Sequence, residues 1–403
     1  MDDLLKYAVD RGMIDLSYVQ EQMRMDERAA ILGKHPYSIW YGNDGKWHTY
    51  LPDEEKGRVP RKRNSQREIE DVIIEFWAKP KTFKAAYFHW RKTHDLTLSN
   101  NSIVRYNTDY KRYFKNGKFE AIELEKLDED AITAFMITTV KNKALCKKAC
   151  KTLFGYVKNT VTNARKNKFM DGNPVEFLRA AQFYKFCKER KRPLETLVVS
   201  DDRMGILNKR FEKDHLVNPN YIPTYAVQLA SLTGMRVGEL SALRWDDIQG
   251  DTIRIDESEK YDRLNKKYVI EKTKNEKERV FPITPEIRTL LETVERIEKR
   301  YGYFCEWVFA NEDGRIHAPV ISSCSKNKCR QTQITEVGIH AYRRTFNSKL
   351  RCAGVPAVVA SSLLGHSEQV NDQYYTFDIT DMESKANMVA LLNKKTSSLG
   401  EAG

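Results

Sequence analysis

The chain has 403 residues, of which 41% are hydrophobic and 31% are charged, and its formal net charge is +12. This length predicts two or three domains, and this composition suits globular folds with long polar faces. The positive charge predicts a polyanionic partner, with nucleic acid the first candidate and an anionic membrane surface the second. No run approaches the roughly 18 apolar residues of a membrane helix, so we expect no transmembrane segment.

The cysteines and the start of the chain indicate a cytoplasmic protein. The seven cysteines form no CxxC pair, and Cys324 and Cys329 lack a histidine at zinc spacing. We therefore expect reduced thiols and no metal site. The first twenty residues carry early acids and no apolar core, so we expect no signal peptide.

After one or two helices up to about residue 35, the sequence predicts a small three-stranded sheet backed by one helix. Short aromatic strands flank an Asn-Asp-Gly turn at 43–45, and Ser65 with Glu68 forms a capping box that opens the helix. The stretch 56–67 contains no acid and six basic residues: Lys56, Arg58, Arg61, Lys62, Arg63 and Arg67. Two interpretations stay open, a solvated basic loop on a surface hairpin or a sheet that presents these side chains to DNA.

Residues 81–175 are predicted to be helical, and the segment 141–168 has nine Lys or Arg and no Asp or Glu. At about 100° per residue, one side of this helix is apolar. That side consists of Cys146, Cys150, Leu153, Val157, Val161 and Ala164. The basic stripe beside it consists of Lys147, Lys151, Lys158 and Arg165. A solvated face would normally mix both signs, so we expect this stripe to contact the phosphate backbone.

Asn173-Pro174 ends the helical segment, and the basic stretch 176–194 is predicted to be a linker. Farther on, an apolar helix ends at Gly234, and Arg236 and Glu239 follow one turn apart. Taken alone, these two side chains suggest an internal salt bridge. Downstream, TIRID, KYVIE and ERVFPI predict strands, and a hairpin between the last two carries KTKNEK, whose lysines would ordinarily be solvated.

The segment 339–377 combines residue types suited to work on a phosphate. His340 and Arg343 lie one turn apart on a helix, and Arg343 offers a planar fork of donors for phosphate oxygens. Gly365 ends the apolar run VPAVVASSLLG and places His366 at the next turn, and Tyr375 follows nine positions later. Each feature alone has an ordinary explanation. The His340–Arg343 pair could be a solvated helix face, Gly365-His366 could be a helix cap, and the tyrosine pair could be one buried and one surface residue. The spacing of all four is much harder to explain by chance.

The order H-x-x-R, then L-L-G-H, then nine residues to a tyrosine resembles the tyrosine recombinase (phage integrase) family. Here His340, Arg343, the segment 363–366 and Tyr375 carry that order. Upstream, T-G-M-R-x-G-E-L-x-x-L-x-W-x-D-I, which contains Arg236, resembles the family's first arginine box. Two boxes far apart in the sequence therefore point to the same family.

The resemblance implies a set of six catalytic residues: Arg236, Lys274, His340, Arg343, His366 and Tyr375. In the family, a tyrosine attacks the phosphate, arginines bind its oxygens and a hairpin lysine reaches the scissile phosphate. Lys274 fits that lysine by its distance from Pro282, with Lys272 as the alternative, and Glu239 matches the supporting acid of the first box. The implied 3′-phosphotyrosyl link conserves the bond energy, so we expect no ATP or other nucleotide cofactor. The sequence contains no P-loop and no carboxylate cluster for two magnesium ions, so we also expect no metal ion.

We therefore predict a mainly α fold with small β-sheets (α+β) in several domains. These are 1–79, an N-terminal helix with an arm-type DNA-binding domain; 80–175, a helical core-binding domain; 176–194, a linker; 195–395, a mixed α/β catalytic domain; and 396–403, a tail. The resemblance implies integration or excision of a mobile element at double-stranded attachment sites by a homotetramer. A host DNA-bending protein and an excisionase are candidate accessory partners. A type IB topoisomerase and a non-catalytic DNA-binding regulator remain alternatives.

Overall fold

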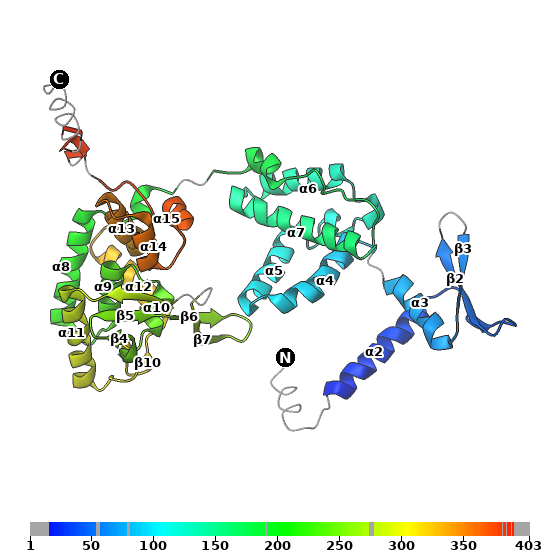
Figure 1. Ribbon diagram of the computed structural model, residues 1–403, viewed down its shortest axis with the longest axis horizontal. Helices are drawn as coiled ribbons and strands as arrows, with labels where there is room; N and C mark the ends of the chain where they lie inside the picture. Colours follow the sequence, from blue (N-terminus) through cyan, green and yellow to red (C-terminus); the bar gives the residue numbers. More distant parts are fainter. Residues whose placement is uncertain are drawn as a thin grey trace, which may run out of the picture. The chain divides into compact units, whose positions relative to one another are not determined.

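The computed structural model describes residues 16–53, 57–78, 81–189, 192–273, 278–380, 382–383, 385–387 and 389–390. The chain divides into two compact units, Met1–Glu189 and Arg190–Gly403 (Figure 1). Within the described ranges, no helix combines the length and the apolar character needed to cross a bilayer.

The first unit begins with a small sheet and two helices. Its elements are α2 (Leu16–Leu32), β1 (Trp40–Tyr41), β2 (Trp47–Asp53), β3 (Gly57–Arg63) and α3 (Gln66–Ala78). The strands form an antiparallel sheet in the order β1-β2-β3. The predicted capping box is confirmed, because Glu68 N–H donates to Ser65 Oγ over 3.2 Å and Ser65 N–H donates to Glu68 Oε2 over 3.3 Å. Helix α3 packs on β2 and β3, where Leu51, Ile69 and Ile73 are buried.

The rest of the first unit is helical, as predicted. It consists of α4 (Phe83–His94), α5 (Asn100–Tyr113), α6 (Glu129–Asn142), α7 (Lys147–Lys166) and the 3₁₀ helices η1 (Asp95–Thr97), η2 (Lys118–Ala121), η3 (Leu124–Lys126) and η4 (Ala180–Phe186). The apolar stripe of α7 is confirmed from Cys150 to Ala164, whose apolar side chains are buried in the core of the unit. Cys146 differs, because it is the N-cap residue of α7 and is only partly buried.

The predicted linker at 176–194 is largely wrong. Leu178 and Phe183 are buried in the core that α4–α7 form, and η4 packs on α6 and α7. The Lys188 N–H also donates to the Leu145 carbonyl over 2.9 Å. The many basic residues of this stretch made it look solvated, although it contains these buried apolar residues.

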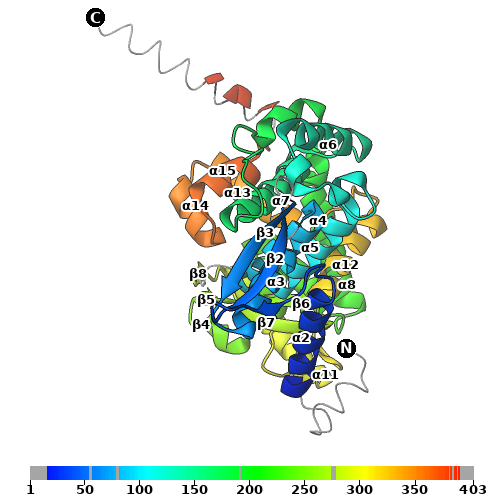
Figure 2. The same cartoon turned by 90° about the vertical axis from the view of Figure 1, so that its right-hand side faces the viewer.

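The second unit surrounds an almost fully buried helix, α9. Its helices are η5 (Leu194–Thr196), α8 (Asp201–Val217), α9 (Pro223–Thr233), α10 (Val237–Ala242), η6 (Trp245–Asp247), α11 (Pro285–Tyr301), α12 (Ala318–Gln331), α13 (Ile339–Cys352), α14 (Ala357–Leu364) and α15 (Glu368–Tyr374). Helices α8, α10, α11, α12 and α13 all contact α9. Both views show α13, α14 and α15 side by side (Figures 1 and 2).

The strands of the second unit pair differently from the prediction. They are β4 (Ile248–Gln249), β5 (Thr252–Ile255), β6 (Glu257–Asp262), β7 (Lys267–Lys272), β8 (Arg279–Pro282), β9 (Ala310–Asn311) and β10 (Gly314–Arg315). The hairpin predicted between KYVIE and ERVFPI is wrong, because β7 pairs with β6 while β8 pairs with β5. The charged segment ESEKYD did not look like a strand, but its buried Glu259 accepts from the Ala318 N–H at the start of α12 over 2.8 Å.

In the part of the chain that the structure describes, four small sheets accompany a mainly helical fold. The predicted fold class is therefore confirmed.

Candidate active site

Helix α13 carries His340 and Arg343 one turn apart. Arg343 is fully buried, and its guanidinium donates to the carbonyl oxygen of Gly234 over 2.9 Å and to that of Leu364. Its Nε has no hydrogen-bond partner among the described residues. Burial, followed by repulsion from Arg236, lowers the pKa of Arg343 to about 9, so the group stays cationic at neutral pH. A buried cation with N–H groups to spare is suited to bind an anion.

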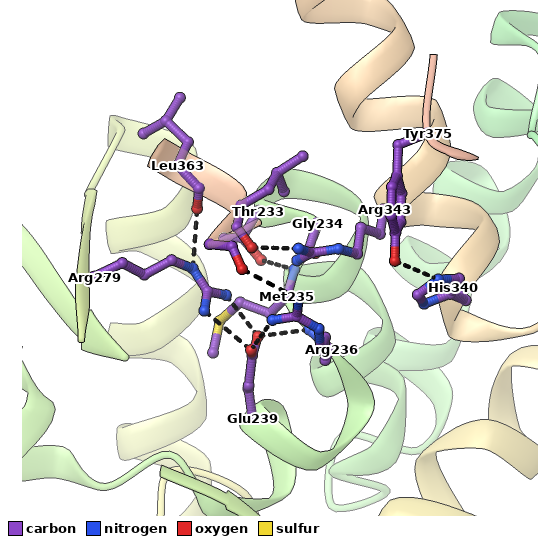
Figure 3. Close-up of polar contacts among 12 residues, drawn as sticks. Thr233, Gly234, Met235, Arg236, Glu239, Arg279, His340, Arg343, Leu363 and Tyr375 are labelled. Carbon is purple, nitrogen blue, oxygen red and sulfur yellow. Dashed lines mark hydrogen bonds and ion pairs between the residues drawn. The ribbon is translucent and has the colours of Figure 1, made fainter. Parts of the chain in front are cut away.

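Glu239 fixes two further arginines (Figure 3). Arg236 is the N-cap residue of α10, and its Nη1 donates to Glu239 Oε1 over 2.7 Å. Arg279, at the start of β8, donates to both carboxylate oxygens over 3.0 and 2.6 Å. Burial alone would raise the pKa of Glu239, but the hydrogen bonds and charge of Arg279, and then the charge of Arg236, lower it to about 2. The carboxylate therefore stays ionised and holds both guanidinium groups in place.

The last turn of α14 gathers these arginines around His366. Three successive carbonyl oxygens accept from three arginines: Leu363 from Arg279 at 3.0 Å, Leu364 from Arg343, and Gly365 from Arg236 at 3.4 Å. The carbonyls form the negative end of the helix dipole, which favours cations there. The predicted glycine cap is confirmed, because Gly365 has a φ of 66°. A Cβ at Gly365 would also lie 3.1 Å from Arg279 Cδ, so the turn has little room for a side chain.

Tyr375, the C-cap residue of α15, lies among these groups. Its hydroxyl is 2.9 Å from His340 Nε2, and its ring stacks on His366 with 4.6 Å between the ring centroids. The Arg343 Cζ lies 5.4 Å from the Tyr375 ring centroid. The structure therefore brings Arg236, His340, Arg343, His366 and Tyr375 into one cluster, although they come from segments far apart in the sequence.

Both histidines of the cluster are held neutral. His340 is an exposed residue, yet partial desolvation of its ring, and then the charges of Arg344 and Arg343, lower its pKa to about 4. Burial, followed by the charges of Arg343 and Arg236, lowers the pKa of His366 to about 4 as well. Neutral His340 can accept a proton at Nε2 near neutral pH, which a general base for the Tyr375 hydroxyl requires.

We expect both imidazoles to titrate near pH 4 in the free protein, below the usual 6.5. Their neutral forms then stabilise the fold fully above about pH 6.5, and this stabilisation is lost as the pH falls toward 4. Histidine ring resonances followed by NMR from pH 8 to pH 4 would check this, with His340→Gln and His366→Gln used to assign the two signals. Midpoints near 6.5 would contradict it.

The lysine of the predicted site, Lys274, lies outside the described residues, in the stretch of sequence between β7 and β8. The alternative, Lys272, is the last residue of β7, and its side chain is exposed.

Arg279 belongs to the site but was missed in the sequence. It is buried, and it donates hydrogen bonds to both Glu239 and the Leu363 carbonyl of the α14 turn. The alternation of residues along β8 could have revealed it. Arg279 and Phe281 alternate with Val280 and Pro282, so both point to the same buried face.

The residues predicted to contact DNA all lie on the surface of the first unit. Exposed side chains on β3 are Arg58, Arg61, Lys62 and Arg63, and exposed side chains on α7 are Lys147, Lys151, Lys158 and Arg165. On the sheet, Arg58 lies 4.4 Å from the ring centroid of Tyr50 and Lys62 is 3.7 Å from Asp44. The surfaces of β3 and α7 are thus available to a polyanion.

Comparisons with known proteins agree with this geometry. Residues 202–379, which contain the whole cluster, match the model of the phage integrase family. A tyrosine recombinase XerC-like protein of Caldanaerobacter subterraneus is 25% identical over 315 residues, which cover 72% of this chain and 77% of the relative. The ICEBs1 integrase of Bacillus subtilis is 27% identical over 148 residues, which cover 34% of this chain and 40% of that protein.

Solved structures share the fold. The Tn1549 transposon integrase in complex with a circular intermediate DNA superposes with a TM-score of 0.62 at 15% identity, over 77% of this chain and 99% of that one. A lambda integrase dimer bound to a core site gives a TM-score of 0.53 at 16% identity, over 87% of this chain and 99% of that one. Residues 202–379, which carry the whole cluster, thus match the phage integrase family, and the relatives and the shared fold agree with that match.

Proposed function

We propose that the protein is a site-specific DNA recombinase that integrates or excises a mobile element through a 3′-phosphotyrosyl intermediate. The observation that carries this proposal is the Tyr375 hydroxyl, 2.9 Å from a neutral His340 and beside the buried cation Arg343. A mobile-element role is supported by the names of the relatives, which include the ICEBs1 integrase and the Tn1549 transposon integrase.

The first chemical step is attack of Tyr375 on a DNA phosphate. A tyrosine hydroxyl has an ordinary pKa near 10, so it needs a base to become a nucleophile at neutral pH. His340 Nε2 takes the proton as the Tyr375 oxygen bonds to phosphorus. Arg236 and Arg343 bind the non-bridging oxygens, where negative charge accumulates in the transition state.

The bond from phosphorus to the 5′ oxygen then breaks. His366 donates a hydrogen bond to the phosphate, and Lys274 supplies the proton that the departing 5′ oxygen needs. Attack by the 5′ hydroxyl of another strand reverses the sequence and rejoins the DNA. Because each phosphodiester bond is exchanged for a phosphotyrosyl bond, the reaction needs no ATP. The arginines supply the positive charge and Lys274 supplies the proton, so the proposed reaction uses no metal ion or other cofactor.

The proposal is tested with nicked duplexes taken from the ends of the protein's own element, in buffer that contains EDTA. We expect a covalent protein–DNA adduct that survives denaturation, and joined products when two partner duplexes are supplied. Relaxation of any supercoiled plasmid without joining would favour the topoisomerase alternative. Binding without an adduct would favour a non-catalytic regulator.

The general acid can be assigned with a modified substrate. Lys274→Ala should slow cleavage of a normal phosphodiester, while a substrate with sulfur at the 5′ bridging position should recover much of the rate, because a thiolate leaves without a proton. The matched variant Lys272→Ala should cleave both substrates normally. Rescue by sulfur in Lys272→Ala instead would move the role to Lys272.

We propose that β3 and α7 bind different DNA sites, β3 an arm site away from the crossover and α7 the crossover itself. Replacing Arg58, Arg61, Lys62 and Arg63 by Gln should weaken only the arm-site complex. A plot of the logarithm of its binding constant against the logarithm of salt concentration should also become less steep, by up to about 4. The matched quadruple variant of Lys147, Lys151, Lys158 and Arg165 should affect only the crossover complex. Footprinting and binding titrations at several salt concentrations measure binding at the arm site and at the crossover separately. Equal losses of affinity at both sites in either variant would refute the assignment.

Strand exchange between two sites requires several protomers, and we propose a homotetramer on DNA that acts in the cytoplasm. A lambda integrase tetramer bound to a Holliday junction, similar in fold with a TM-score of 0.51, supports that assembly. A host DNA-bending protein or an excisionase is a candidate accessory partner.

A further inference from the structure

A buried polar cluster ties the chain on both sides of Tyr375 to helix α13. The amide of Asn347 donates to Asn371 Oδ1 over 3.0 Å, and the amide of Asn371 donates back to Asn347 Oδ1 over 2.7 Å. Both asparagines are fully buried. Asn371 lies on α15, so this reciprocal pair joins the helix that Tyr375 caps to the helix that carries His340.

Ser348, the next residue on α13, holds the chain directly at the tyrosine. It is fully buried, and its hydroxyl donates to the Tyr375 carbonyl over 3.1 Å and accepts from the Phe377 N–H over 3.0 Å. Thr376, between them, accepts from the Asn347 amide over 3.2 Å. The Tyr375 N–H donates to the Asn371 carbonyl over 3.0 Å. The backbone is therefore fixed before, at and after the tyrosine.

Helix α13 thus carries the proton acceptor, the phosphate ligand and the anchor of the nucleophile. His340, Arg343 and Asn347 recur at spacings of three and four residues, so they follow one face of the helix. Because Tyr375 is anchored to that same helix, its hydroxyl has a set position relative to His340 Nε2 and Arg343. Burying two amides and a hydroxyl is unfavourable unless every donor and acceptor is matched, and here the members match one another.

We infer that Asn347, Ser348 and Asn371 are positioning residues that hold the Tyr375 hydroxyl in line for attack. The inference rests on the proposed function, since it assigns a task only if Tyr375 is the nucleophile. These residues touch neither the phosphate nor the reacting oxygen. They act through the backbone of residues 375–377, so their loss should reduce the rate of the chemical step and leave DNA affinity unchanged.

The test measures three quantities for Asn347→Ala, Asn371→Ala and Ser348→Ala: the adduct rate at saturating nicked DNA, the DNA Kd and the Tm. We expect the rate to fall by at least about 10-fold, because a displacement near 1 Å can cost about 100-fold, while Kd stays within about 2-fold. Ser325→Ala is the matched control, since Ser325 is also fully buried on a helix and donates to the Val337 carbonyl over 3.1 Å. It should lower Tm and leave the rate unchanged.

The double variant Asn347→Leu/Asn371→Leu distinguishes an effect on the position of Tyr375 from an effect on the stability of the fold. It removes both amides together, so neither leaves the other unpaired, and the Thr376 hydroxyl can still donate to the Asn371 carbonyl at 3.2 Å. The Tm should therefore recover relative to the single variants. The rate should stay low, because the tie from Asn347 to Thr376 is lost. A rate that recovers together with Tm, a slow Ser325→Ala, or near-normal rates in all three single variants would overturn the inference. Those outcomes differ from failure of the proposed function, in which the unaltered protein forms no adduct or Tyr375→Phe still forms one.

Discussion

Tyr375→Phe is expected to abolish covalent attachment to DNA and to leave DNA binding nearly intact. The change removes one oxygen, whose contact is His340 Nε2 at 2.9 Å, and keeps the ring that stacks on His366. The backbone ties of Tyr375 to Asn371 and Ser348 do not involve the hydroxyl, so the fold should be unaffected. Denaturing gels after incubation with nicked duplexes measure the adduct, and gel shifts measure binding.

The neighbouring tyrosine provides the matched control. Tyr374→Phe should form the adduct at a normal rate, because Tyr375 is the tyrosine whose hydroxyl contacts His340. If Tyr375→Phe keeps the adduct while Tyr374→Phe loses it, the register of the predicted site is wrong by one residue.

Arg343→Ala and Arg236→Ala are each expected to slow cleavage by at least about 100-fold, the usual size for removing one donor to a developing oxyanion. Arg343→Lys and Arg236→Lys should also be slow, because an ammonium keeps the charge but lacks the planar fork of donors. Rates of adduct formation at saturating DNA measure the effect. A near-normal rate in either alanine variant would show that its guanidinium does not bind the scissile phosphate.

The two arginines should differ in their effect on stability. Arg343 is 0% exposed, and its loss leaves the carbonyls of Gly234 and Leu364 without their donors, at about 1–3 kcal/mol for each buried group. The Arg236 side chain is 37% exposed, so Arg236→Ala should lower Tm much less. A large loss of rate in Arg236→Ala without a large loss of Tm would therefore isolate the catalytic effect.

Local patterns made much of this site predictable from the sequence. The spacing of His340 and Arg343 on a helix, the glycine that ends α14 and the box around Arg236 each depend on only a few neighbouring residues. The same is true of the α7 stripe, whose 3.6-residue period shows directly in the sequence. That the separate boxes meet in space followed from the family resemblance and not from these patterns.

The features that the sequence did not reveal depend on partners distant along the chain. Arg279 pairs with Glu239 forty residues away, and Asn347 pairs with Asn371 twenty-four residues away. The strand β6 is charged and polar, and it is a strand because its backbone pairs with β7, while the donor at the start of α12 satisfies its buried Glu259. A buried polar residue has the same sequence signature as a solvated one until its partner is known.

The central claim, that Tyr375 is the nucleophile, is tested most directly by mass spectrometry of the protein–DNA adduct. Trypsin releases the segment 352–385, which contains both Tyr374 and Tyr375, and fragment ions distinguish the two. We predict a nucleotide attached through its 3′ phosphate to the Tyr375 oxygen, with a free 5′ hydroxyl on the other DNA fragment. Attachment at another residue, or through a 5′ phosphate, would contradict the account.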